Sequence, residues 1–179
     1  MNHLELTKQY WKTLLHPSDL AIDATCGNGH DTLFLSELSS VISLDIQEAA
    51  IRNTEALLAS KGKKATLYRL NHADIDSLSL PHSPRLIVYN LGYLPGGDKS
   101  LTTLLGTTLI SVEKAKTMLA EDGALSITCY PGHKEGAIEE KALCNWAEKL
   151  SYKEWRVCHH RWINRTNAPS ILWIEKIGK

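Results

Sequence analysis

The sequence predicts an α/β fold in which helices cover both faces of a mostly parallel sheet. Short apolar runs alternate with longer amphipathic segments along most of the chain, as expected of repeated strand and helix units. Near the end, two β-rich runs, 153–160 and 170–177, follow each other with no helix between them. They predict a C-terminal antiparallel hairpin added to the parallel sheet.

The first half of the chain is predicted to alternate strands and helices after an opening helix. The apolar spacing of Leu6, Tyr10 and Leu14 predicts that helix, and Pro17 predicts its end near residue 16, because the residue before proline disfavours helix. Strands are predicted at 20–24, 41–45 and 65–70, and helices at 31–38 and 47–60.

The second half continues the same alternation. The near-continuous apolar run 85–90 is typical of a central strand that is covered on both faces. A long helix is predicted at 102–119, a fifth strand at 124–130 and a further helix at 134–150. No repeat or low-complexity linker interrupts the chain, so residues 1–179 are predicted to form one domain.

The most informative motif is the turn after the first strand, Asp23-Ala-Thr-Cys-Gly-Asn-Gly-His-Asp-Thr32. Its two glycines, Gly27 and Gly29, allow a close backbone approach to a ligand, and the following helix offers unpaired N–H groups. Asp45 ends the second strand, where a carboxylate can accept both hydroxyls of a ribose. Together these features predict a nucleoside-binding βαβ unit.

The details of this turn favour S-adenosylmethionine over a dinucleotide. Thr32 stands where the dinucleotide motif has its third glycine. Asp23 would repel a pyrophosphate but suits the ammonium group of a methionine moiety, which disfavours a nicotinamide-dependent oxidoreductase. We therefore expect a Rossmann-like class I methyltransferase fold. The predicted cofactor-binding residues are Asp23, Thr25, Gly27, Asn28, Gly29, Asp31, Thr32, Asp45, Gln47, Asn71, His72 and Asn90.

Polar residues follow the later strands, where ligands of open α/β sheets bind. Asn71 and His72 follow the third strand and could border adenine or simply cap the loop. The segment 90–99 resembles the Asn-Pro-Pro-Tyr loop of methyltransferases that act on amino nitrogens, although Leu91 and Gly92 replace the prolines. In such a loop the Asn oxygen accepts a hydrogen from the target amine, and the Tyr stacks on the substrate base.

The expected reaction is in-line displacement at a sulfonium methyl group, in which alignment supplies about 7–11 kcal/mol of barrier lowering. An aliphatic amine with a pKa of about 10.4 must first lose its proton. Asp98, His133 and Tyr93 are the candidates that receive or direct it. Asp98 could instead pair with Lys99, and His133 could simply cap a helix. With Asn90, these residues form the predicted catalytic set.

Composition limits the remaining classes. Hydrophobic residues make up 43% of the chain, and no apolar run approaches the ~20 residues that span a bilayer. The N-terminus lacks the pattern of a signal peptide, so a cytoplasmic protein is predicted. Cys26, Cys129, Cys144 and Cys158 are widely spaced, which predicts reduced thiols and no metal site.

Net charge is zero, but its distribution is uneven. Acidic residues outnumber basic ones in 1–60, whereas basic residues outnumber acidic ones in 151–179. The cationic C-terminal end, with Trp155 and Trp162, could contact phosphates and stack on single-stranded RNA. A solvated surface and a core role for these tryptophans remain the alternatives.

Four segments, 23–32, 90–99, 130–133 and 164–169, resemble the YtqB-like (MnmM) family, and the likeness covers nearly the whole chain. Ser170 stands where that family usually has a second proline. The resemblance implies an S-adenosylmethionine-dependent enzyme that converts 5-aminomethyl-2-thiouridine to 5-methylaminomethyl-2-thiouridine at the tRNA wobble position. It implies the anticodon stem-loop as partner, and the RNA-binding residues predicted with it are Tyr93, Lys99, Arg161, Asn164, Arg165 and Asn167.

Three alternatives to this function stay open. An rRNA or a small metabolite could be the methyl acceptor, or the chain could sense S-adenosylmethionine without catalysis. Asn90 and Tyr93 argue against a sensor, because a sensor needs no loop that accepts a nitrogen. No membrane association is expected, and a homodimer is kept open as the assembly.

Overall fold

The computed structural model describes residues 2–92, 103–165 and 167–178, and its elements follow the predicted alternation. The helices are α1 (His3–Leu14), α2 (His30–Leu35), α3 (Glu48–Ser60), α4 (Leu105–Met118) and α5 (Lys134–Ala147), with a 3-10 helix, η1 (His72–Ser77). The strands are β1 (Leu20–Asp23), β2 (Ser40–Asp45), β3 (Thr66–Arg69), β4 (Leu86–Asn90), β5 (Ala124–Cys129), β6 (Trp155–His160) and β7 (Ser170–Lys176).

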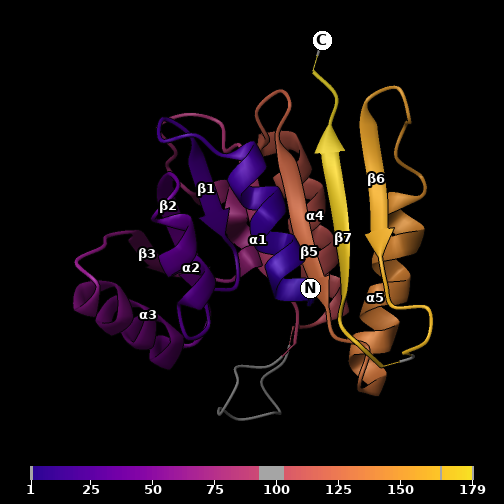
Figure 1. The fold of residues 1–179 in the computed structure, drawn as a ribbon, viewed down its shortest axis with the longest axis horizontal. Coiled ribbons are helices and arrows are strands. Elements are labelled where there is room, and N and C mark those ends of the chain that lie inside the picture. Colours follow the sequence, from indigo (N-terminus) through magenta and orange to yellow (C-terminus); the bar gives the residue numbers. More distant parts are fainter. Residues whose placement is uncertain (1, 93–102, 166, 179) are drawn as a thin grey trace.

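The seven strands form one sheet in the order β3-β2-β1-β4-β5-β7-β6. Strands β1 to β5 pair in parallel, and β7 runs antiparallel to both β5 and β6, which confirms the predicted C-terminal hairpin. The chain order reverses between β1 and β4, and their carboxyl ends lie at the lower end of the sheet in Figure 1. Open α/β sheets bind ligands at such a switch point.

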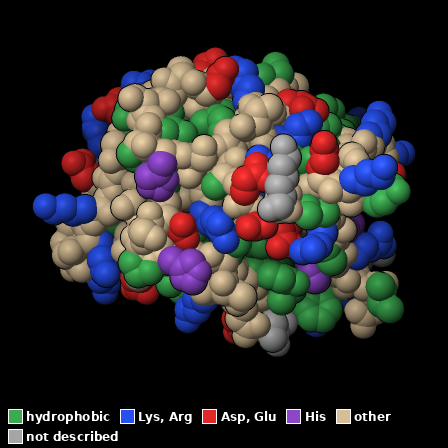
Figure 2. All heavy atoms as spheres, turned by 90° about the horizontal axis from the view of Figure 1, so that it is seen from above, with side chains coloured by type: hydrophobic (Ala, Val, Ile, Leu, Met, Phe, Trp, Pro, Cys, Tyr) green, Lys and Arg blue, Asp and Glu red, His purple; other side chains and the backbone are tan. Residues whose placement is uncertain are grey.

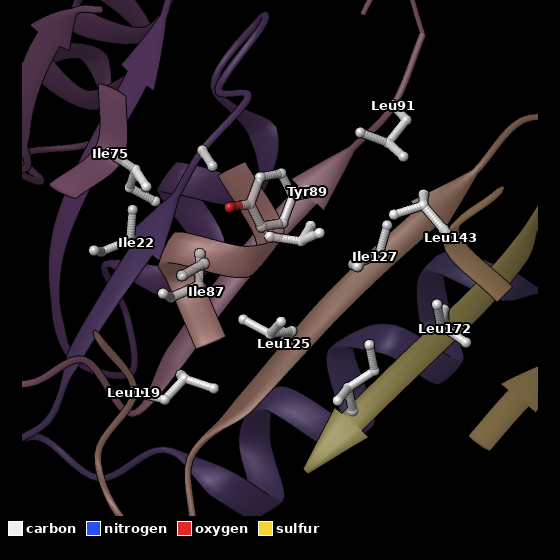
Figure 3. Close-up of a cluster of buried hydrophobic side chains, with 14 of the residues drawn as sticks. Ile22, Ile75, Ile87, Tyr89, Leu91, Leu119, Leu125, Ile127, Leu143 and Leu172 are labelled. Carbon is white, nitrogen blue, oxygen red and sulfur yellow. The ribbon is translucent and has the colours of Figure 1, made fainter. Parts of the chain in front are cut away.

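Helices cover both faces of the sheet, as predicted (Figure 1). On one face, Trp11 of α1 and Leu35 of α2 pack against β1, β2, β4 and β5. On the other face, side chains from α4 and α5 join Ile22, Ile87 and Leu125 in the larger core cluster, which Figure 3 shows around the central strands. Burial on both faces explains the apolar run of β4, whose first four residues are buried.

Helix α1 is fixed at its start and at its centre. A capping box between Asn2 and Glu5 satisfies the first N–H groups of the helix. The buried indole N–H of Trp11 donates to the Ser126 hydroxyl on β5 over 3.0 Å. The second contact docks α1 on β5, and the contact of His3 with Tyr130 places the beginning of α1 beside the carboxyl end of that strand.

Three details differ from the sequence-based expectation. Helix α2 ends at Leu35 rather than at residue 38, and helix α5 ends at Ala147 rather than at residue 150. The 3-10 helix η1 was not predicted at all. Of the helices in the described ranges, none is long and apolar enough to cross a bilayer.

Candidate active site

The turn between β1 and α2 combines left-handed glycines with close packing. Gly27 and Gly29 have φ values of 52° and 81°, a region that L side chains rarely adopt. A Cβ on Gly29 would lie 2.8 Å from the Cα of Thr54 in α3. Gly29 is therefore needed for packing between the turn and α3, a reason that the motif alone did not reveal.

Asp45 at the end of β2 faces this turn, as predicted. Its carboxylate accepts the Gly27 N–H over 3.1 Å and the Gln47 N–H over 2.9 Å. The residue is partly exposed, no ion pair joins it to a cation in the described chain, and partial burial raises its pKa. Such a carboxylate retains lone pairs for the hydroxyls of a ligand. Asn28, in the same turn, accepts from the side chain of Asn53 in α3 over 3.0 Å.

Asp23 lies beneath the turn and is fully buried. It accepts the Thr32 hydroxyl over 2.6 Å and the Thr25 N–H over 3.3 Å, and Thr32 also contacts the Ser43 hydroxyl at 3.0 Å. Burial, followed by the nearby charge of Asp31, raises the pKa of Asp23 to about 7. The side chain of Thr32, which replaces the third glycine, thus supports the turn from inside.

Asn90 at the end of β4 joins the turn to the second half of the sheet. Its backbone N–H donates to the Thr25 hydroxyl over 2.7 Å, and its side-chain nitrogen donates to Asp31 over 2.7 Å. These two bonds orient the amide, and its oxygen makes no hydrogen bond within the described residues. Asn90, Asp31 and Thr25 are all partly exposed, so an acceptor oxygen is held at the switch point of the sheet.

Asn71 and His72 lie after β3, as predicted, and both also have structural roles. The Asn71 oxygen accepts the Ala73 N–H over 2.9 Å and caps η1. His72 is buried, and its ring meets Tyr89 edge to face with ring centroids 6.1 Å apart. Burial lowers the pKa of His72 to about 4, so its ring is neutral at physiological pH.

His133 caps α5, where its Nδ1 accepts the Gly136 N–H over 3.1 Å. Two neighbouring aromatic residues were not predicted. Tyr130 follows β5 and packs edge to face against His3 of α1, with ring centroids 6.0 Å apart. Burial, followed by the charge of Asp31, raises the pKa of Tyr130 to about 12. Burial lowers the pKa of His3, although the charge of Asp31 acts to raise it.

The remaining predicted residues fall into two groups. Tyr93, Asp98 and Lys99 lie outside the described residues. The predicted RNA-binding residues Arg161, Asn164, Arg165 and Asn167 are exposed in the connection between β6 and β7. Because β7 starts opposite the last residue of β5, that connection lies at the same end of the sheet as Asn90.

The two tryptophans and the cysteines have distinct environments. Trp155 is 9% exposed and belongs to the core, which is the alternative to RNA stacking given above for the tryptophans. Trp162 is 44% exposed. All four cysteines are free, and burial raises the pKa of Cys26 to about 12, which disfavours a thiolate nucleophile in the turn. Across the described ranges, no cluster of three metal-ligating side chains occurs.

Comparison with known proteins adds independent evidence. The family model described as "Putative rRNA methylase" matches residues 41–176. The chain is also 34% identical, over 188 aligned residues, to the Arabidopsis thaliana protein named tRNA (mnm(5)s(2)U34)-methyltransferase, chloroplastic. That alignment covers 96% of this chain and 68% of the relative.

Two solved structures are similar over nearly their full lengths. The protein from Clostridium thermocellum named "putative rRNA-methylase" superposes with a TM-score of 0.94 at 33% identity, covering 99% of this chain and 98% of that one. A Streptococcus mutans protein named "putative methyltransferase", solved in complex with SAH, has a TM-score of 0.91 at 32% identity, with 99% of both chains covered.

Proposed function

Since the chain belongs to the family described as "Putative rRNA methylase", we propose that it is an S-adenosylmethionine-dependent tRNA methyltransferase. Its acceptor is the aminomethyl nitrogen of 5-aminomethyl-2-thiouridine at the wobble position, which becomes 5-methylaminomethyl-2-thiouridine. The named activity of the Arabidopsis relative supports this acceptor. The whole chain, residues 1–179, acts as one methyltransferase domain.

The arrangement of Asn90 is the observation that carries the proposal. Its amide nitrogen is committed to Asp31 at 2.7 Å, so the amide oxygen is oriented to accept a hydrogen from a substrate amine. A group that accepts this hydrogen directs the nitrogen lone pair toward the methyl donor. A protein that only senses the cofactor would not need such an acceptor.

The residues around the turn fit the cofactor. Asp45 accepts only backbone N–H groups in the described structure, which suits it to bind the ribose hydroxyls. Asp31 is partly exposed beside Asn90, and its carboxylate favours the ammonium group of the methionine moiety. The neutral ring of His72, beside Asn71, borders the adenine. When bound, S-adenosylmethionine supplies an electrophilic methyl group on a sulfonium.

The substrate amine is deprotonated by one of three residues, His133, Asp98 or Tyr93. Partial desolvation of the amine in the site, at the carboxyl ends of the strands, lowers the amine pKa and assists this step. Tyr93 also stacks on the substrate base, and Lys99 contacts the RNA backbone.

The RNA partner is the anticodon stem-loop, held by Arg161, Asn164, Arg165 and Asn167. These side chains are exposed at the same end of the sheet as Asn90, which allows one RNA loop to reach both. Figure 2 shows the opposite end of the molecule, where Lys and Arg side chains are interspersed with Asp and Glu. The free cysteines suit the reducing cytoplasm, although the Arabidopsis relative is named as chloroplastic. A homodimer stays a prediction.

The acceptor class is tested by incubating the protein with radiolabelled S-adenosylmethionine and separated RNA fractions. We use tRNA and rRNA from cells that lack the native enzyme, so that the target positions are unmethylated. Label is expected in tRNA and absent from rRNA. Label confined to rRNA would overturn the tRNA assignment, and failure to bind the cofactor would overturn the methyltransferase assignment itself.

A further inference from the structure

A cavity of about 340 Å³ lies between the start of α1 and the end of the β6–β7 hairpin. His3 and Leu6 of α1 line one side, and His160, Arg161 and Trp162 line the other. The volume lies within the range of about 300–1,000 Å³ typical of pockets for small ligands. Its lining combines an exposed indole with a guanidinium, which is the pairing that binds a base and its phosphate.

The walls of this cavity are held by interactions on their outer sides. The Nε2 of His160 is 2.9 Å from the Tyr10 hydroxyl, and the Tyr10 ring stacks on Trp173 with centroids 4.8 Å apart. On the other wall, the Arg165 guanidinium lies 5.7 Å from the centre of the Trp162 ring. One wall is therefore fixed by α1, and the other carries Arg161 and the 44% exposed Trp162, whose ring has the Arg165 guanidinium over one face.

The cavity adjoins the candidate active site through His3. The His3 ring packs against Tyr130, and the charge of Asp31 acts on both residues. Asp31 in turn bonds Asn90 at 2.7 Å. Tyr130 follows β5 by one residue, and Asn90 of β4 pairs with Thr128 of β5. The cavity and Asn90 therefore lie at the same end of neighbouring strands, where two successive nucleotides of one RNA loop can reach both.

From this placement we propose that the cavity binds a nucleotide adjacent in the RNA to the methylated one. Its base stacks on Trp162, and its phosphate pairs with Arg161. The inference rests on the proposed function. It adds a second base-binding position, separate from the glycine turn and from the site around Asn90. Such a subsite would hold the RNA loop while the target nucleotide enters the active site.

The test uses anticodon stem-loops that carry the target nucleotide, either intact or with an abasic residue at the position before or after it. Binding to the protein loaded with S-adenosylhomocysteine is measured by fluorescence anisotropy for wild type, Trp162→Ala and Trp162→Phe. For wild type, one of the abasic substitutions is expected to weaken binding about tenfold, or about 1.4 kcal/mol. Trp162→Ala is expected to lose the same factor with the intact loop and nothing further with that abasic loop. Trp162→Phe retains most of the affinity.

Tyr152→Ala is the matched control, because Tyr152 is an exposed aromatic residue (81%) before β6, at the other end of that strand. It should bind the intact loop as wild type does. Equal binding of the intact loop by wild type and Trp162→Ala would overturn the subsite. It would also be overturned if Trp162→Ala weakened binding of the abasic loop by the same factor as binding of the intact loop, because the two changes would then act independently. Methyl transfer to the intact loop by wild type is measured in parallel, so a failure of the proposed function is seen separately.

Discussion

At the level of single side chains, we propose that Asp45 binds the cofactor and that Asn90 aligns the methyl acceptor. Asp45, at the end of β2, accepts an N–H group of the glycine turn. Asn90, at the end of β4, donates to Asp31 of α2. We predict that Asp45→Ala weakens binding of S-adenosylhomocysteine at least tenfold, since a charge-assisted hydrogen bond contributes about 1.5–3 kcal/mol. Asn90→Ala should bind the cofactor within about threefold of wild type while kcat falls at least tenfold.

Calorimetric titration and steady-state methylation give the two readouts for these variants. Glu55→Ala is a suitable control, because it removes an exposed carboxylate from α3 that lies outside the glycine turn and outside the end of β4. If Asp45→Ala and Asn90→Ala lose cofactor binding equally, the proposed division of roles is wrong.

Asp23 should give the stability of the protein a pH dependence. Its folded pKa of about 7 lies above its ordinary value of 3.8, so between these values the folded chain holds a proton that the unfolded chain has lost. Stability from this residue is greatest below pH 3.8 and falls as the pH rises toward 7, by up to about 4 kcal/mol. His72 acts in the opposite sense, because its lowered pKa adds stability as the pH rises from about 4 to 6.5.

The difference between wild type and Asp23→Asn isolates the contribution of Asp23. Urea unfolding at pH 5.0 and 7.5 should show the variant gaining stability relative to wild type as the pH rises. A difference between the two proteins that does not change with pH would mean that Asp23 titrates near its ordinary value in the folded state.

Packing between the glycine turn and α3 brings the N-cap of that helix, Gln47, next to Asp45 at the end of β2. A Cβ on Gly29 would meet the Thr54 backbone at 2.8 Å, whereas a Cβ on Gly62 has no neighbour within 4 Å, and both glycines have positive φ. Gly62→Ala should therefore cost only the left-handed strain of about 1–2 kcal/mol. Gly29→Ala should cost more, and it should also weaken cofactor binding because α3 must shift.

Thermal unfolding and calorimetry of these two variants check the comparison. Equal destabilisation with unchanged cofactor affinity would show that the contact between Gly29 and Thr54 does not position the site.

Most elements could be predicted because their causes are local. Apolar periodicity and proline or glycine boundaries marked the strands and most helices, and the missing helix between 160 and 170 predicted the hairpin. The 3-10 helix η1 escaped prediction because its six residues span too few turns for a periodic pattern.

The site was predictable where a motif brings its residues together, and less so where distant segments meet. Asp45 was expected to face the glycine turn, and it does. Nothing in the sequence linked His3 to Tyr130, because their contact depends on the docking of α1 against the sheet. From the sequence, Thr32 indicated only that the third glycine of the dinucleotide motif is missing. Its hydrogen bond to Asp23 forms only in the folded turn.

At the scale of the whole molecule, the topology gathers the residues that we propose for the cofactor, the methyl acceptor and the RNA at one end of the sheet. The carboxyl ends of β1, β2 and β4 carry the glycine turn, Asp45 and Asn90. Since β6 runs in the same direction as β5, its end brings Arg161 and Trp162 to that edge as well. The antiparallel hairpin therefore extends a cofactor-binding sheet by a surface that an RNA loop can contact.

The central claim is methyl transfer to the aminomethyl nitrogen of the wobble nucleoside, and nucleoside mass spectrometry tests it most directly. The protein is incubated with S-adenosylmethionine and tRNA that carries 5-aminomethyl-2-thiouridine, and the RNA is digested to nucleosides. We predict that 5-aminomethyl-2-thiouridine is replaced by 5-methylaminomethyl-2-thiouridine with wild type and at least tenfold more slowly with Asn90→Ala. An unchanged 5-aminomethyl-2-thiouridine signal from cofactor-bound wild type would contradict the account.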